Sequence, residues 1–101
     1  MKKKYPVFYL PPAEQDLGEL FEYIMQDSPS EASILLDKVD RSIMRLSQFP
    51  LSGATPRDKY LKKKGYRILI IGDYLVFYRF ENRKIFIYRV LHGKRQYKFL
   101  F

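Results

Sequence analysis

The spacing of the apolar residues changes once along this chain, and that change constrains the fold more than any other feature. Between residues 11 and 48 apolar side chains recur every three or four positions, which predicts amphipathic helices. Between residues 66 and 91 apolar and aromatic residues form short runs, which predict strands. Helices grouped before strands are typical of an α+β fold, in which the helices cover one face of a sheet.

Proline residues divide the helical half into two helices. Pro12 suits the first turn of a helix, and the apolar stripe after it predicts a helix of about 13 residues. Ser28 and Pro29 restart the pattern as N-cap and first helical residue, and Glu31 is the expected reciprocal partner of Ser28 in a capping box. Pro50 ends the second helix. Because the break is so short, the two helices should form an antiparallel hairpin.

The second half predicts three antiparallel strands joined by tight turns. Gly72 and Asp73 form a two-residue turn of type II′, and residues 81–83 form the second turn. The strands that these turns separate cover residues 66–71, 74–80 and 84–91. Strand alternation places Ile85, Ile87 and Arg89 on one face of the last strand.

A further strand is expected at residues 5–10, and it should join the same sheet because a lone strand has no partner. The stretch from residue 50 to residue 64 is expected to be polar and turn-rich. The predicted order is therefore β-α-α-β-β-β: a helical hairpin packed on a twisted antiparallel sheet. A length of 101 residues fits one domain, residues 1–101.

Charge is spread unevenly along the chain. The formal net charge is +8, yet residues 1–56 carry six basic and eight acidic side chains. Residues 57–101 carry thirteen basic and three acidic side chains, interleaved with Tyr and Phe. Such a segment predicts a polyanionic or acidic macromolecular partner. A merely solvated, lysine-rich surface is the alternative.

Several classes of site are excluded by composition. The chain has no cysteine and one histidine, which rules out disulfides and thiolate metal sites and makes a zinc site improbable. We expect no metal and no cofactor. No apolar run approaches the roughly 20 residues that span a bilayer. A soluble cytoplasmic protein without membrane contact is therefore expected.

Motifs in both halves, taken in order, resemble one family. They are residues 13–17 (AEQDL), 46–53 (LSQFPLSG), 65–67 (GYR), 74–78 (YLVFY) and 89–95 (RVLHGKR). Over nearly the whole chain, this order and spacing resembles the RelE/ParE superfamily of toxins from type II toxin–antitoxin modules. The resemblance implies a small basic toxin that inhibits growth and is held inactive by an acidic antitoxin, whose C-terminal segment wraps around it. Exposed apolar positions on the helical hairpin and the sheet edge are candidate docking positions for that segment.

The superfamily divides by target. RelE-like members cut mRNA on the ribosome without a metal, and ParE-like members inhibit DNA gyrase. The resemblance implies an arginine at the position of Leu75 in RelE-like enzymes, so this chain lacks a phosphate-stabilising cation there. A ParE-like toxin acting on gyrase is therefore favoured. A ribosome-dependent endoribonuclease and a non-toxic basic nucleic-acid-binding module are the alternatives.

Most candidate site residues are basic. Nuclease chemistry would need proton transfer and charge neutralisation, for which the candidates are Lys62, Lys64, Arg67, His92, Arg95 and Tyr97. Candidates for contact with nucleic acid or a target protein are Lys62, Lys63, Lys64, Arg67, Arg79, Arg89, Lys94, Arg95 and Lys98. The lone histidine is alternatively a strand-end residue with a structural hydrogen bond, and the lysine run is alternatively a solvated loop. The apolar residues 99–101 are expected to dock on the body of the protein.

Overall fold

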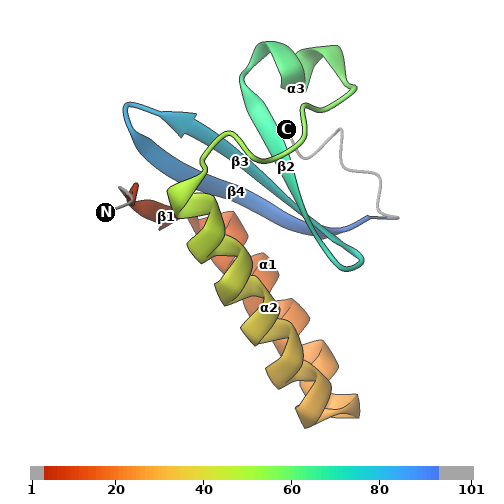
Figure 1. Cartoon of the computed structure of the whole chain (residues 1–101). Coiled ribbons are helices and arrows are strands. Elements are labelled where there is room, and N and C mark those ends of the chain that lie inside the picture. The colour runs from red at the N-terminus through yellow and green to blue at the C-terminus, as the bar shows by residue number, and fades with distance from the viewer. Residues whose placement is uncertain (1–3, 94–101) are drawn as a thin grey trace.

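The computed structural model describes residues 4–93 and contains a helical hairpin, a four-stranded sheet and a short third helix (Figure 1). The elements in chain order are β1 (Val7–Tyr9), α1 (Pro11–Asp27), α2 (Pro29–Gln48), α3 (Lys59–Lys63), β2 (Tyr66–Ile71), β3 (Tyr74–Glu81) and β4 (Lys84–His92). The predicted α+β order is confirmed, and α3 is an addition to it. The predicted docking of residues 99–101 lies outside the described residues. Within those residues no helix is both long enough and apolar enough to cross a membrane.

One residue, Ser28, both ends α1 and begins α2. Its backbone N–H donates to the Ile24 carbonyl oxygen at 2.8 Å, and its Oγ accepts a hydrogen bond from the Glu31 N–H at 3.3 Å. The predicted N-cap is confirmed. The expected return bond from the Glu31 side chain is wrong, because the Ser28 N–H already closes the last turn of α1. α1 runs for 17 residues, since Pro11 fits its first turn as well.

The sheet has the strand order β1-β4-β3-β2 and is mixed rather than antiparallel throughout. β2, β3 and β4 form the predicted antiparallel meander, whereas β1 runs parallel to β4, with Val7 to Tyr9 opposite Ile85 to Ile87. Tight turns force antiparallel pairing within the meander. β1 has no such constraint, because the whole hairpin and two strands lie between it and β4 in the chain.

Both turns of the meander contain two residues. Gly72 has a φ of 58°, as the predicted type II′ turn requires. In the second turn Glu81 pairs with Lys84, so the turn is Asn82-Arg83 rather than residues 81–83. Both of these residues have positive φ (51° and 61°), which is the type I′ geometry that matches the twist of a hairpin.

β4 carries one extra residue in the middle of its ladder with β3. Phe77 lies opposite Arg89 and Tyr78 lies opposite Ile87, so Tyr88 has no partner on β3. This bulge turns Arg89 onto the face of Phe77, away from Ile87. The expectation that Arg89 shares a face with Ile87 is therefore wrong, because strict alternation does not reveal a bulge.

Both faces of the sheet are covered, by different helices. The hairpin packs on the face that carries Val76, Tyr78 and Ile87, where the main core lies. The short helix α3 packs on the opposite face. There its Leu61 is buried against Phe77 on β3 and Leu91 on β4. In Figure 1 the hairpin lies below the sheet and α3 above it, beside β2.

The fully buried Tyr78 ties the loop after α2 to the sheet. Its hydroxyl donates to the Pro50 carbonyl oxygen at 2.8 Å and accepts a hydrogen bond from the Gly53 N–H at 2.9 Å. A Cβ at residue 53 would lie 2.5 Å from that hydroxyl oxygen, so glycine is required there. Arg67 holds the same loop, because its Nη1 donates to the carbonyl oxygens of Leu51 and Gly53 at 3.2 and 3.0 Å.

The substitution Tyr78→Phe should lower the free energy of unfolding by about 1–3 kcal/mol, because it leaves the buried Gly53 N–H without its acceptor. Urea denaturation monitored by circular dichroism measures this free energy of unfolding. Tyr23→Phe is the matched control, since Tyr23 is 70% exposed, and it should change stability by less than about 0.5 kcal/mol. Equal stability of the two variants would contradict the assigned role of Tyr78.

Alkaline pH should also destabilise the fold. Burial raises the pKa of Tyr78 above the ordinary tyrosine value of about 10, and burial acts in the same direction on Tyr9. The unfolded chain therefore loses these protons first, so stability is retained below about pH 10 and falls as pH rises above it. Unfolding free energies measured across this range should fall less steeply for Tyr78→Phe than for the unaltered protein.

Candidate interaction surface

Folding separates the charges of the chain in space. The hairpin, residues 11–48, carries eight acidic and three basic side chains, a net charge of −5. Residues 49–93 carry ten basic and three acidic side chains, a net charge of +7. Residues 49–93 include α3 and the strands β2, β3 and β4, so most of the basic side chains belong to α3 and to the sheet. The hairpin, which carries most of the acidic side chains, covers one face of that sheet. We call the sheet face opposite the hairpin, together with α3, the basic face.

The predicted lysine run lies on α3 and not in a loop. Lys62 and Lys63 form the last turn of this helix, Lys64 is its C-cap, and all three are exposed. The helix begins at Asp58, whose carboxylate accepts a hydrogen bond from the Leu61 N–H at 3.0 Å, and the buried Leu61 side chain anchors it to the sheet. An aspartate three residues before a buried leucine is the N-cap signal that could have revealed this helix.

Arg79 on β3 lies between two tyrosines of the basic face. Its guanidinium carbon is 5.5 Å from the Tyr66 ring centre and 5.9 Å from that of Tyr88, and the two rings meet edge-to-face at 5.0 Å. Arg79 also pairs with Glu81. Burial, and then Tyr88, raise the pKa of Tyr66 despite the opposing effect of Arg79, so Tyr66 is neutral near pH 7. This trio can stack and donate hydrogen bonds, but Tyr66 is no general base.

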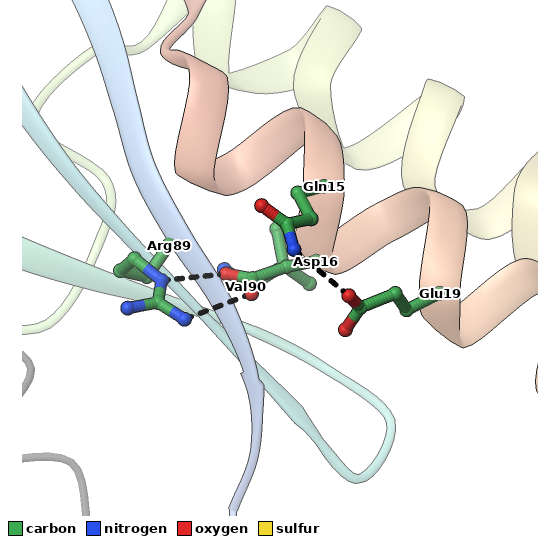
Figure 2. Close-up of polar contacts among 5 residues, drawn as sticks. All are labelled: Gln15, Asp16, Glu19, Arg89 and Val90. Carbon is green, nitrogen blue, oxygen red and sulfur yellow. Dashed lines mark hydrogen bonds and ion pairs between the residues drawn. The ribbon is translucent and has the colours of Figure 1, made fainter.

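Arg89 forms an ion pair with Asp16 on α1, and this contact joins the sheet to the hairpin. The Asp16 Oδ2 lies 2.7 Å from Arg89 Nε, and its Oδ1 lies 2.9 Å from Arg89 Nη2 (Figure 2). Oδ2 also accepts a hydrogen bond from the Val90 N–H at 3.0 Å, beyond the point where β1 stops pairing with β4. The bonds to Asp16 raise the pKa of Arg89. The carboxylate thus takes the place of a strand residue at this edge.

Arg67 and His92 lie apart from the group of Arg79, Tyr66 and Tyr88. Arg67 shares a face with Tyr78 and holds the loop after α2. His92 is exposed and lies opposite Tyr74, with the two rings edge-to-face at 5.5 Å. Arg79 lies five positions after Tyr74 on β3, about 17 Å along an extended strand, so His92 and Arg79 lie toward opposite ends of β3.

The remaining candidates, Lys94, Arg95, Tyr97 and Lys98, lie outside the described residues. Leu75, where the resemblance implies an arginine in RelE-like enzymes, packs against the apolar cluster of Leu61, Phe77 and Leu91. The neighbourhood of this position is therefore hydrocarbon rather than cationic.

Comparison with known proteins agrees with this architecture. A sequence model of the family described as the ParE toxin of the type II toxin–antitoxin system parDE matches residues 7–97. This chain belongs to the ParE toxin family. It is thus a toxin of the RelE/ParE superfamily, as the ordered motifs predicted. No curated protein sequence matches the chain.

Solved structures share the fold of this ParE-family toxin. The chromosomal ParDE system from P. aeruginosa includes a chain that superposes with a TM-score of 0.73 at 17% identity, covering 91% of this chain and 99% of that one. The toxin–antitoxin complex RelBE2 from Mycobacterium tuberculosis includes one with a TM-score of 0.63 at 25% identity, covering 88% of this chain and 98% of that one.

Sequence reasoning missed two members of the basic face of this ParE-family toxin. Tyr66 and Tyr88 flank Arg79, yet they lie 22 residues apart in the chain and on strands that do not pair with each other. Tyr66 lies opposite Arg79 on one side of β3, and Tyr88 lies on the strand at its other side, so only the assembled sheet brings the two rings together.

Asp16→Asn should destabilise this ParE-family toxin by about 2–3 kcal/mol, because an amide nitrogen would replace one acceptor of a largely buried ion pair. Only 9% of the Asp16 side chain and 18% of the Arg89 side chain are exposed. Asp37→Asn is the control, since the Asp37–Arg41 pair is 59% and 80% exposed and should contribute less than about 0.5 kcal/mol. Equal losses in urea denaturation would contradict the assignment.

Proposed function

We propose that this ParE-family toxin inhibits growth by binding DNA gyrase through its basic face, and that a cognate antitoxin neutralises it. The choice of gyrase over mRNA rests on one observation: Leu75 packs in an apolar cluster with Phe77 and Leu91. RNA cleavage requires groups that neutralise the developing negative charge of the phosphorane. A leucine cannot do this, so a protein target is favoured over cleavage of mRNA.

The basic face has the chemistry of a protein-binding surface. Lys62, Lys63 and Lys64 are exposed at the end of α3, and the packing of this helix on the sheet rests on Leu61. The Lys64 ammonium lies 5.6 Å from the ring centre of Tyr60 on the same helix. Exposed cations steer an acidic partner toward the surface before contact. Arg79 with its flanking tyrosines supplies the arginine and aromatic side chains that dominate binding energy at protein interfaces.

Two findings support neutralisation by an antitoxin: the chain belongs to a toxin family of type II toxin–antitoxin systems, and the similar RelBE2 structure is a toxin–antitoxin complex. An acidic antitoxin segment would bring carboxylates to the basic face and would order as it binds. Occupying that face would exclude the target, because both partners would need the same lysines.

Purified toxin should block DNA supercoiling by gyrase. Replacing Lys62, Lys63 and Lys64 by alanine should raise the concentration for half-inhibition by about tenfold, equivalent to roughly 1.4 kcal/mol, because the steering charges are lost. The control removes equal charge from the hairpin, by replacing Lys38, Arg41 and Arg45 with alanine, and should inhibit like the unaltered toxin. Circular dichroism verifies that both variants fold.

Undiminished supercoiling at excess toxin would reject gyrase as the target. Cleavage of translated mRNA within the ribosomal A site after toxin induction would instead establish the endoribonuclease alternative. Under that alternative His92→Ala should reduce toxicity, whereas it should be nearly silent if the toxin acts on gyrase. Harmless overexpression with steeply salt-dependent nucleic-acid binding would indicate the non-toxic binding module.

A further inference from the structure

A largely apolar hollow lies where the end of α2, the loop after it and the sheet meet. Its volume is about 590 Å³, within the range of roughly 300–1,000 Å³ that is typical of small-molecule sites. Three aromatic side chains line it together with two aliphatic ones: Tyr5, Phe49, Phe80, Pro50 and Leu51. Phe80 packs against the main core, so the hollow lies on the hairpin side of the sheet and away from the basic face.

The walls of the hollow are fixed by the fold itself. The Tyr78 hydroxyl donates to the Pro50 carbonyl oxygen, and Arg67 donates to two further carbonyl oxygens of the same loop. On another wall the Tyr5 N–H donates to the Ser47 carbonyl oxygen at 2.8 Å, and the Tyr5 ring meets the Phe80 ring edge-to-face at 5.0 Å. A cavity with fixed walls binds a ligand without a large cost of ordering.

Three polar side chains complete the lining: Arg45 and Gln48 at the end of α2, and Ser52 in the loop. Within residues 4–93 none of these three side chains takes part in a hydrogen bond or ion pair, whereas Arg41, one turn before Arg45, is paired with Asp37. Of the described residues that line the hollow, none is acidic. Arg45 therefore brings an uncompensated positive charge to an apolar cavity, and a guanidinium can hold a carboxylate through two N–H donors.

The size and composition of the hollow fit a small ligand better than a macromolecule. A protein partner typically contacts about 20–30 residues on its side of an interface, and eight residues line this hollow. A nucleic-acid strand needs cations for several phosphates, and Arg45 is the one cation among the described lining residues. Aromatic walls instead favour another aromatic ring, in edge-to-face or offset contact.

We propose that this hollow binds a small aromatic carboxylate, with the ring among the three aromatic side chains and the carboxylate on Arg45. Gln48 and Ser52 supply further donors for the carboxylate oxygens. The proposal goes beyond the action on gyrase and does not depend on it. Because the ligand contacts both the end of α2 and the loop after it, its binding should raise the melting temperature of the toxin.

The chemistry of the ligand can be tested with naphthylacetate and its neutral analogue naphthylacetamide. Titration of the isotope-labelled full chain, followed by NMR, should shift the backbone amide signals of Phe49, Leu51 and Ser52, with a dissociation constant for naphthylacetate below about 1 mM. The neutral amide should bind about fivefold more weakly, because it lacks the charge that Arg45 pairs with. Equal binding of the two probes, shifts confined to other residues, or no binding of naphthylacetate would overturn the proposal.

A third probe represents a protein partner. It is a short peptide in which glutamate and phenylalanine alternate, so it offers the same two chemical groups along an extended chain. The peptide should bind more weakly than naphthylacetate, because the hollow accommodates one ligand of limited size. Tighter binding of the peptide would overturn the assignment of the hollow to a small molecule.

The role of Arg45 can be tested with Arg45→Gln, which removes the charge and keeps a residue that favours helix. The variant should bind naphthylacetate about fivefold more weakly and naphthylacetamide as before. Arg41→Gln is the matched control, since Arg41 lies on the same helix and outside the hollow, and it should bind both probes normally. Equal affinity of the two variants for naphthylacetate would overturn the proposal.

The position of the site can be tested with Leu51→Glu, which brings a negative charge into the hollow. Leu51 is 59% exposed, so the variant should fold, which circular dichroism verifies, and its binding of naphthylacetate should be lost. The control Met44→Glu changes a residue that is 57% exposed on α2 and outside the hollow, and it should bind normally. Undiminished binding by folded Leu51→Glu would overturn the proposal.

The ligand site and the gyrase target can fail separately, because they lie on different sides of the sheet. Failure of the unaltered toxin to inhibit supercoiling, with selective binding of naphthylacetate retained, would reject the target and support the ligand site. Inhibition of supercoiling without selective binding of naphthylacetate would overturn the ligand site and leave the proposed function standing.

Discussion

The Asp16 carboxylate links α1 to β4 beside the apolar core that packs the hairpin on the sheet, and the charge available on the other face depends on this link. It pairs with Arg89 and accepts the Val90 N–H where β1 no longer pairs with β4 (Figure 2). A single side chain thereby joins α1 to the central region of the sheet and removes one cation from the surface. Since the hairpin is held on one face, only the opposite face remains for α3 and its lysines.

The result is a small protein with two chemically opposite surfaces. The basic face combines exposed lysines with an arginine held between two tyrosine rings, which suits an acidic macromolecule. The hairpin, by contrast, carries an excess of acidic side chains, with a net charge of −5 over residues 11–48.

Local signals were readable in the sequence wherever neighbouring residues decide the structure. Ser28 and Pro29 mark the break between the helices, and Gly72 marks a type II′ turn, because capping and turn geometry depend on a few consecutive residues. The bulge at Tyr88 and the parallel direction of β1 were missed, since both arise from pairing between distant strands. The helix α3 was missed although Asp58 carries its N-cap signal, because its five residues are too few to show a helical period.

The amino-acid sequence by itself determined the order of helices and strands, the superfamily and the excess of positive charge in the second half. The tertiary structure alone decided which of those cations remain at the surface. Arg89 is bound to a carboxylate 73 residues away, Arg67 donates to the loop after α2, and Arg79 lies beside two tyrosines. The physical reason is that a cation is engaged or available according to the acceptors that folding brings to it, and these acceptors lie far from it in the chain.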